Sequence, residues 1–251
     1  MRRRDFITLL GGAAVAWPLA TQAQEEIILE SASYADLRQL VTQPGSGSEI
    51  DVPAQLDFPA GGNGNCGDRA HVGGYQETNE GWFAAEFRKA GFASLTYDSF
   101  AARKVDASQA GGAQPGDFAS GVADAYAAPR SLAVNPMIEA DQVAIIGISF
   151  GGEVTHLAAF ESFRRSLAGE QRFGTFSSFY PAGVYAPWAE AGAYTGQPVL
   201  MLLGDRDDNL PLEKVNGFLR YEQAFNPSFL VQVRVYNGAR HTWTVAGLGY
   251  P

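Results

Sequence analysis

A serine flanked by two glycines is the residue of this chain best suited to nucleophilic chemistry. Residues 147–151 read Gly-Ile-Ser-Phe-Gly, so that Ser149 stands two positions from both Gly147 and Gly151. The spacing is typical of a nucleophile elbow, a sharp strand-to-helix turn in which a side chain at either glycine would collide with the neighbouring backbone. A serine on such a turn projects its hydroxyl into a cleft. The pattern therefore predicts that Ser149 is a nucleophile.

The segments on both sides of the serine indicate the elements that would hold it. A loop at Asn135–Pro136 precedes the apolar run 143–146, which predicts a buried strand. Residues 153–160 contain no proline or glycine and favour a helix. Strand, turn and helix together support the elbow. The alternative is a glycine-rich turn that contains a serine without a chemical role.

A serine nucleophile needs a base, and the chain has three histidines. His156 falls on the helix expected behind Ser149, and that helix runs away from the cleft. His71 precedes the serine, whereas elbow enzymes follow the chain order serine, acid, histidine. His241 lies in a loop after an expected strand at 229–236. By elimination, His241 is the expected base.

An acid that orients the histidine is expected between the serine and His241 in the chain. The apolar run 198–203 predicts another buried strand, and an acidic loop follows it at 204–211. Three side chains of this loop are candidates: Asp205, Asp207 and Asp208. The residues alone leave these alternatives open, because the others would be solvated loop charges.

Several of these segments together resemble the dienelactone hydrolase family of the α/β-hydrolase superfamily. The resemblance rests first on 147–151, 204–211 and 238–243. Residues 71–75 are similar to the family's His-Gly-x-Gly-Gly oxyanion loop, and residues 82–92 to the helix and strand that follow it.

The resemblance covers roughly residues 50–245 and implies an α/β fold. This is the α/β-hydrolase fold, with a mostly parallel central sheet and helices on both faces. The alternation of apolar runs with helical stretches agrees with it. The runs expected to form strands are 92–97, 143–148, 198–203 and 229–236.

The resemblance also selects one aspartate. In the family the acid stands three residues after a glycine, with a proline four residues beyond it. Gly204, Asp207 and Pro211 meet this spacing. Asp207 is therefore the expected acid, and Asp205 and Asp208 are the alternatives.

The superfamily stabilises a tetrahedral oxyanion with two backbone N–H groups. The resemblance implies that Phe150 supplies one of them. The second is expected from Val72 or Gly73, because glycines there let the backbone approach the substrate.

These roles predict a carboxylic ester hydrolase with a Ser-His-Asp triad and an acyl-enzyme, whose expected partner is a small-molecule ester or lactone. No cofactor and no metal are expected, because the acidic loop lacks the spaced carboxylates of a calcium site. Two alternatives stay open: a hydrolase-fold protein that has lost activity, and an exported small-molecule binding protein.

Some features depart from the family's pattern. Dienelactone hydrolases proper use a cysteine nucleophile, but the single cysteine, Cys66, lies in the polar stretch 61–70, where the family has an apolar strand. Either this strand is displaced or the oxyanion loop is held less firmly. Pro129 predicts a kink near Ala128. Only ten residues follow His241, so the superfamily's C-terminal helix is expected to be missing.

The N-terminal residues 1–23 resemble a twin-arginine signal peptide, with a basic start at Arg3 and Arg4 and a short apolar core. The core is shorter than the roughly twenty residues of a membrane span, which leaves a retained anchor as the weaker alternative. The leader predicts export to the periplasm. Residues 24–49 are expected to form a lead-in segment and residues 50–251 the hydrolase domain.

Charge narrows the range of partners. Removing the leader takes away three arginines and one aspartate and moves the formal charge from −9 to about −11. Nucleic acid and stable association with anionic membranes are therefore not expected, since both need basic patches. A single cysteine excludes an internal disulfide, and the sequence leaves the oligomeric state open.

Substrate identity is the least determined feature. Aromatic residues near the expected strand ends either line a substrate pocket or simply pack, and Arg103 either holds a substrate carboxylate or is solvated. The aromatic residues concerned are Tyr180, Tyr185, Trp188 and Trp243.

Overall fold

The computed structural model describes residues 24–59, 66–71, 77–106, 113–185, 187, 191–227 and 229–245 of the 251-residue chain. The expected leader, residues 1–23, lies outside the described residues, as do Val72, Gly73 and Trp188. For 66–71 the description is limited to the main chain.

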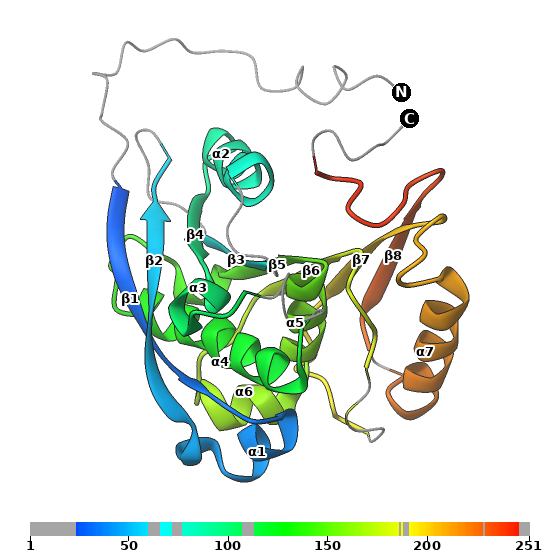
Figure 1. Ribbon diagram of the computed structural model, residues 1–251, viewed down its shortest axis with the longest axis horizontal. Helices are drawn as coiled ribbons and strands as arrows, with labels where there is room; N and C mark the ends of the chain where they lie inside the picture. The colour runs from blue at the N-terminus through cyan, green and yellow to red at the C-terminus, as the bar shows by residue number, and fades with distance from the viewer. Residues whose placement is uncertain are drawn as a thin grey trace.

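An eight-stranded sheet forms the centre of the described part of the molecule, in the order β1-β2-β4-β3-β5-β6-β7-β8 (Figure 1). The strands from β4 to β8 in this order are parallel, whereas β1 and β2 add an antiparallel edge. The bounds are β1 (Gln24–Ser33), β2 (Ser48–Asp57), β3 (Cys66–His71), β4 (Ala93–Tyr97), β5 (Ala144–Ile148), β6 (Thr175–Phe179), β7 (Val199–Gly204) and β8 (Val231–Tyr236).

Four of these strands, β4, β5, β7 and β8, fall on the runs that were expected from the sequence to form strands. All five residues of β4 are buried, and most residues of β5 and β7 are buried as well. Parallel strands covered on both faces need apolar side chains at nearly every position, which is why continuous runs identify them. The predicted α/β-hydrolase fold with a mostly parallel sheet is confirmed.

The segment 24–49, expected as a lead-in, contributes a strand to this sheet. β1 pairs with β2 along its whole length, from Gln24 opposite Asp57 to Ser33 opposite Ser48. Residue 50, the expected domain boundary, lies inside β2. β1 is therefore part of the sheet, and its Leu29 is fully buried.

The polar stretch that interrupted the family's pattern ends in a central strand. β3 lies between β4 and β5, with Gly67 opposite Ser94 on one side and Ala144 on the other. The strand is therefore displaced towards the end of the stretch, one of the two outcomes expected. Main-chain hydrogen bonds to two neighbours satisfy its backbone whatever its side chains are.

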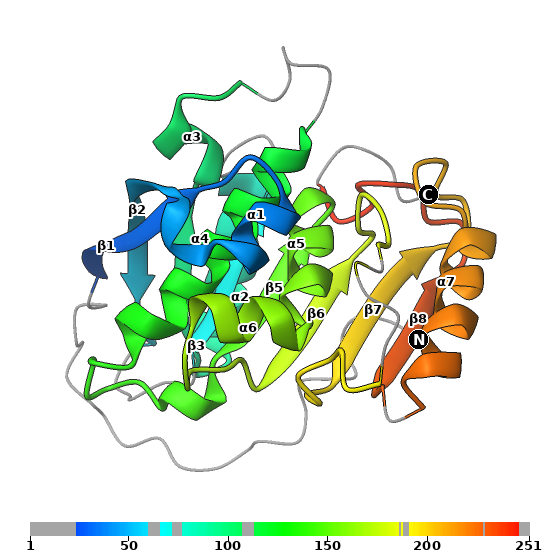
Figure 2. The ribbon, with the colours of Figure 1, turned by 90° about the horizontal axis from the view of Figure 1, so that it is seen from below.

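Helices cover both faces of the sheet (Figures 1 and 2). α2 lies on one face, against β4, and a layer of α1, α4, α5 and α6 lies on the other, whereas α7 lies beside β8. The bounds are α1 (Leu37–Thr42), α2 (Trp82–Lys89), α3 (Ser99–Arg103), α4 (Pro115–Leu132), α5 (Phe150–Ala158), α6 (Glu161–Leu167) and α7 (Leu212–Phe225).

Helix α4 continues through Pro129 to Leu132. Pro129 stands in the last turn, where its missing N–H removes one intrahelical hydrogen bond near the end of the helix. Among the described residues, no helix is long and apolar enough to cross a membrane.

Candidate active site

The turn between β5 and α5 has the geometry of a nucleophile elbow. Ser149 adopts the left-handed backbone angles φ 56° and ψ −112°, and α5 begins at the next residue, Phe150. Such angles are costly for a residue with a side chain and persist only where the surroundings impose them. A Cβ atom at Gly147 would lie 1.8 Å from the carbonyl oxygen of Gly151, so this position requires glycine.

Main-chain hydrogen bonds fix the elbow to the neighbouring strand. The Ser149 N–H donates to the carbonyl of Phe179, the last residue of β6, at 3.0 Å. The Ser149 carbonyl accepts from the N–H groups of Glu153 and Ala182 at 3.0 and 2.9 Å. The strained turn is thus supported from both sides.

Three of the predicted site residues form one hydrogen-bonded chain. Ser149 Oγ lies 2.8 Å from His241 Nε2, and His241 Nδ1 lies 2.9 Å from Asp207 Oδ2. The serine is half-buried, and the side chains of His241 and Asp207 are 15% and 2% exposed. The order is that of a nucleophile, a base and an orienting carboxylate.

The environment of Asp207 favours its ionised form. Its Oδ1 accepts the N–H groups of Asn209 and Leu210 at 2.9 and 3.0 Å. Burial raises the pKa of this carboxyl, but the hydrogen bond from His241 and the two amides outweigh burial and hold it below its usual value. A carboxylate is therefore available to bind the imidazole Nδ1–H.

The two alternative aspartates have other partners. Asp205 Oδ1 accepts the N–H of Gly238 at 2.6 Å and so supports the turn after β8. Asp208 forms an ion pair with Arg240 at 3.2 Å, with an 86% exposed side chain. Of the three aspartates, Asp207 is the one bonded to His241.

His156 lies outside this chain of hydrogen bonds. His156 is fully buried on α5, with ring contacts to Phe160 at 5.6 Å and Phe218 at 5.0 Å. Burial lowers the pKa of His156 to about 4, so the ring is neutral at physiological pH. His71 is the last residue of β3, and its side chain lies outside the description.

One of the two expected oxyanion donors can be located. Phe150 is the first residue of α5, where the N–H has no acceptor within the helix. Its buried ring packs against Phe100 and Phe118, at 5.1 and 4.7 Å. The other expected donors, Val72 and Gly73, lie outside the described residues.

Arg103 is neither solvated nor free to bind a substrate. Its guanidinium forms a bidentate ion pair with the fully buried Asp124 at 2.7 and 2.9 Å. It also donates to the Ser33 hydroxyl at 2.8 Å, and Ser31 donates to Asp124 at 2.5 Å. This group ties β1 to α3 and α4, the helices that carry Phe100 and Phe118.

The aromatic residues near the strand ends are mostly packed. Tyr180 is fully buried, and Trp243 contacts Tyr180 and Tyr236 at 5.8 and 4.5 Å between ring centroids. Tyr185 is 53% exposed. Among the described side chains, no group of three histidine, cysteine, aspartate or glutamate residues is arranged to hold a metal.

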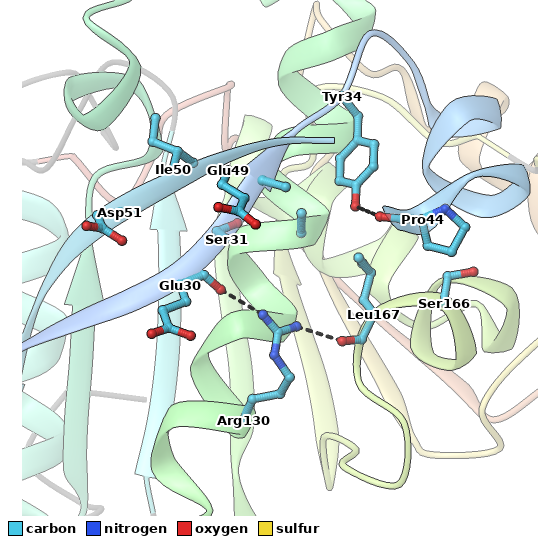
Figure 3. A pocket seen from close by; sticks show the side chains of 12 residues that line it. Glu30, Ser31, Tyr34, Pro44, Glu49, Ile50, Asp51, Arg130, Ser166 and Leu167 are labelled. Atoms are coloured by element: carbon cyan, nitrogen blue, oxygen red, sulfur yellow. Dashed lines mark hydrogen bonds between the residues drawn. The ribbon is translucent and has the colours of Figure 1, made fainter. Parts of the chain in front are cut away.

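A cavity of about 500 Å³ opens beside β1, β2 and α4, lined by none of the residues of the Ser149 site (Figure 3). Arg130 lies in it and donates to the main-chain carbonyls of Leu167 and Glu30 at 2.6 and 2.8 Å. The guanidinium thus ties β1 to α4 and α6.

The family and the fold can be compared with known proteins. The family model of dienelactone hydrolases matches residues 71–248. A search of curated proteins gave no match.

Solved structures resemble the chain over most of its length at low identity. A candidate dienelactone hydrolase from Klebsiella pneumoniae is 18% identical, with 87% of this chain and 88% of that chain covered and a TM-score of 0.59. A dienelactone hydrolase-like promiscuous phosphotriesterase from metagenomic libraries is 17% identical, with 88% of this chain and 84% of that chain covered and a TM-score of 0.58. Thermogutta terrifontis esterase 2 phosphorylated by paraoxon is 16% identical, with 80% of this chain and 82% of that chain covered and a TM-score of 0.59.

At these identities the structural likeness shows the fold. The residues matched by the family model also include the site: the elbow with Ser149, the acidic loop with Asp207 and the loop with His241. The chain belongs to the dienelactone hydrolase family.

Proposed function

We propose that this protein is a serine hydrolase that cleaves a small carboxylic ester or lactone through Ser149, His241 and Asp207. The observation that carries the proposal is the hydrogen-bonded chain from the Ser149 hydroxyl through the imidazole to the Asp207 carboxylate, with links of 2.8 and 2.9 Å. Membership of the dienelactone hydrolase family supports the same reaction class.

In the first half of the reaction, Ser149 Oγ attacks the carbonyl carbon as its proton passes to His241 Nε2. Asp207 accepts the Nδ1–H, which fixes the imidazole tautomer and stabilises the imidazolium that forms. The tetrahedral intermediate then collapses. The alkoxide leaves with the proton from His241, and the acyl group stays on Ser149.

In the second half, water attacks the acyl-enzyme while His241 again takes the proton, and the carboxylic acid is released. For a lactone, the alcohol and the acid are two ends of one product. The oxyanion of each tetrahedral intermediate is bound by the N–H of Phe150 and by a second N–H from Val72 or Gly73. Each such donor contributes on the order of a hundredfold to a thousandfold in rate.

Active-site titration with a fluorophosphonate tests the proposal directly, since the probe reacts with an activated serine. We expect one adduct per chain, mapped to Ser149 by peptide mass. Ser149→Ala and His241→Ala should abolish it, whereas Ser166→Ala, on α6 and outside the site, should leave it unchanged. Phosphorylation of the Thermogutta esterase by paraoxon supports the choice of an organophosphorus probe.

A folded wild-type protein that forms no adduct would contradict the proposed function. That result would favour an inactive hydrolase-fold protein or an exported binding protein. With an adduct in hand, hydrolysis of short-chain p-nitrophenyl esters and of simple lactones would identify the preferred substrate class.

We also propose that the enzyme acts in the periplasm after export by the twin-arginine route. The Arg3-Arg4 pair and the short apolar core of residues 1–23 support this. Cell fractionation tests it: replacing both arginines with lysine should leave the chain in the cytoplasm, and an unchanged distribution would contradict the export route.

A further inference from the structure

Tyr180 occupies a strained, buried position beside the His241 ring. It follows β6 directly, has φ 29°, and is fully buried. Its N–H donates to the carbonyl of Leu202 in β7 at 2.8 Å, which holds the backbone between two central strands. A non-glycine residue at such an angle requires strong support from its surroundings.

The side chain of Tyr180 makes two contacts with the loop that carries the histidine. Its ring meets the His241 ring edge to face, with 5.1 Å between centroids and 69° between planes. Its hydroxyl forms a hydrogen bond with the hydroxyl of Thr244, three residues beyond the histidine. One side chain therefore contacts both the imidazole and the turn that follows it.

The hydrogen bonds around Thr244 have a defined direction. Thr244 donates its single hydroxyl proton to Asn79 Oδ1 at 3.2 Å, so its oxygen must accept the proton of Tyr180. Asn79 Nδ2 in turn donates to Glu80 Oε1 at 3.2 Å, and both of these residues are buried. The donors thus point from the tyrosine towards the glutamate.

The acidity of Tyr180 is compatible with this direction. Burial raises the pKa of the phenol to about 12, and the hydrogen bond with Thr244 opposes the rise only in part. The phenol keeps its proton, and can donate it, at every pH at which an esterase would be assayed.

The backbone of the histidine turn has an unusual conformation. Thr242 has φ 62°, in the left-handed region, and the N–H of Val245 donates to its carbonyl at 2.9 Å. This bond closes the turn on itself. The hydroxyl of Thr244 links the turn to Tyr180, after β6, and to the short π-helical segment η2 (Glu77–Gly81), while the ring of Trp243 contacts Phe179 of β6.

We propose that Tyr180 is a positioning residue for His241 and that it acts both through ring contact and through the hydroxyl of Thr244. The inference rests on the proposed function, because it concerns the base of that reaction. Displacements of about 1 Å in a catalytic group can cost a hundredfold in rate. Loss of the Thr244 link should therefore slow the chemical step without weakening substrate binding.

A matched pair of substitutions at Thr244 tests the proposal. Thr244→Val keeps the shape and removes the hydroxyl, whereas Thr244→Ser keeps the hydroxyl. Thr244 is partly exposed, which favours folding of both variants. We expect Thr244→Val to lower kcat for p-nitrophenyl acetate about tenfold, with KM within about twofold, and Thr244→Ser to restore most of the loss.

The rate constant for fluorophosphonate labelling of Ser149 provides a second readout and should fall in parallel with kcat. Tyr180→Phe, which keeps the ring and loses the hydroxyl, should resemble Thr244→Val. Circular dichroism and thermal unfolding verify that each variant is folded.

Equal rates for Thr244→Val and Thr244→Ser would overturn the inference, as would a loss confined to KM or a lower Tm with unchanged kcat. Failure of the proposed function gives a different result, because the wild-type protein itself would then neither react with the probe nor hydrolyse the ester.

Discussion

Two histidines of this domain lie in opposite environments. His156, on α5, is fully buried against the rings of Phe160 and Phe218, and burial lowers its pKa to about 4. His241 lies at the edge of the sheet, 15% exposed, between a hydroxyl and a carboxylate. Among the described residues, no carboxylate bonds to His156.

The difference shows that the neighbours of an imidazole decide its chemistry. A ring packed only against hydrocarbon cannot take a proton without losing solvation, so it acts as an apolar side chain. A ring that donates Nδ1–H to a carboxylate presents Nε2 as a base and is stabilised when it becomes charged. His156 lies within α5 and His241 in the loop after β8, so the two rings also differ in their place in the fold.

The strongest test of this comparison replaces each ring in turn. His241→Ala should lower kcat/KM for an ester on the order of 10⁴-fold or more, because the base is lost. His156→Leu should change kcat/KM by less than about threefold, since the ring contacts of His156 are with aromatic side chains outside the Ser149 site. Steady-state kinetics on both folded variants measure these effects. Comparable losses of kcat/KM in the two variants would contradict the assignment of His241 as the base.

The next test removes the charge beside His241 and leaves its ring. Asp207→Asn should lower kcat about 10⁴-fold, because an amide favours the wrong imidazole tautomer and cannot stabilise the imidazolium. Asp208→Asn, at an exposed ion pair, should have no measurable effect on kcat. Asp205→Asn should act on stability by about 1 kcal/mol, through the N–H of Gly238, and not on kcat. Full activity in Asp207→Asn would contradict the proposed role.

Burial of the His156 ring should make the free energy of unfolding depend on pH. Folding lowers the pKa of His156 from its ordinary value of 6.5 to about 4, so the unfolded chain binds a proton that the folded chain excludes. Stability is fully present above about pH 6.5 and declines as pH falls towards 4, by on the order of 3 kcal/mol. Urea unfolding of the wild type and His156→Leu across this range should show the decline in the wild type alone, and parallel curves would exclude it.

A smaller effect of the opposite sign is expected from a neighbour on the same helix. Burial raises the pKa of Glu153, in the first turn of α5, to about 7. Its contribution to stability is present below about pH 4.5 and is lost as pH rises towards 7. Glu153→Gln should therefore be more stable than the wild type at pH 8, by on the order of 1 kcal/mol, and no more stable at pH 4. Denaturant midpoints at the two pH values measure this difference.

Much of the site could be predicted because its requirements are local. Gly147 is demanded by a clash with Gly151 four residues away, and the strand before it is a short apolar run. The choice of Asp207 came from the resemblance to the family, whose acid has the same spacing from a glycine and a proline. Steric clashes and burial within a short segment restrict which residues can occupy it, so these features can be recognised in the sequence.

Other features depend on partners that are distant in the chain. β1 places glutamates at exposed positions of an edge strand, and β6 contains two serines. Neither strand is therefore a continuous apolar run that could be recognised in the sequence. Arg103 looked like a lone cation because its partner, Asp124, lies on a different helix. The contact of Thr244 with Asn79 joins residues 165 positions apart, which no local pattern can reveal.

The position of β3 has a consequence for how the chain folds. Gly67 pairs with Ser94 and with Ala144, and the whole of β4, α3 and α4 lies between β3 and β5 in the sequence. Closing a loop of that length costs entropy before the second set of hydrogen bonds forms, which slows folding. Until β5 arrives, the innermost strand of the finished sheet is an open edge, and its unpaired amides and carbonyls can bind another chain. We therefore expect aggregation during refolding to involve β3, although in the native sheet this strand is paired on both sides.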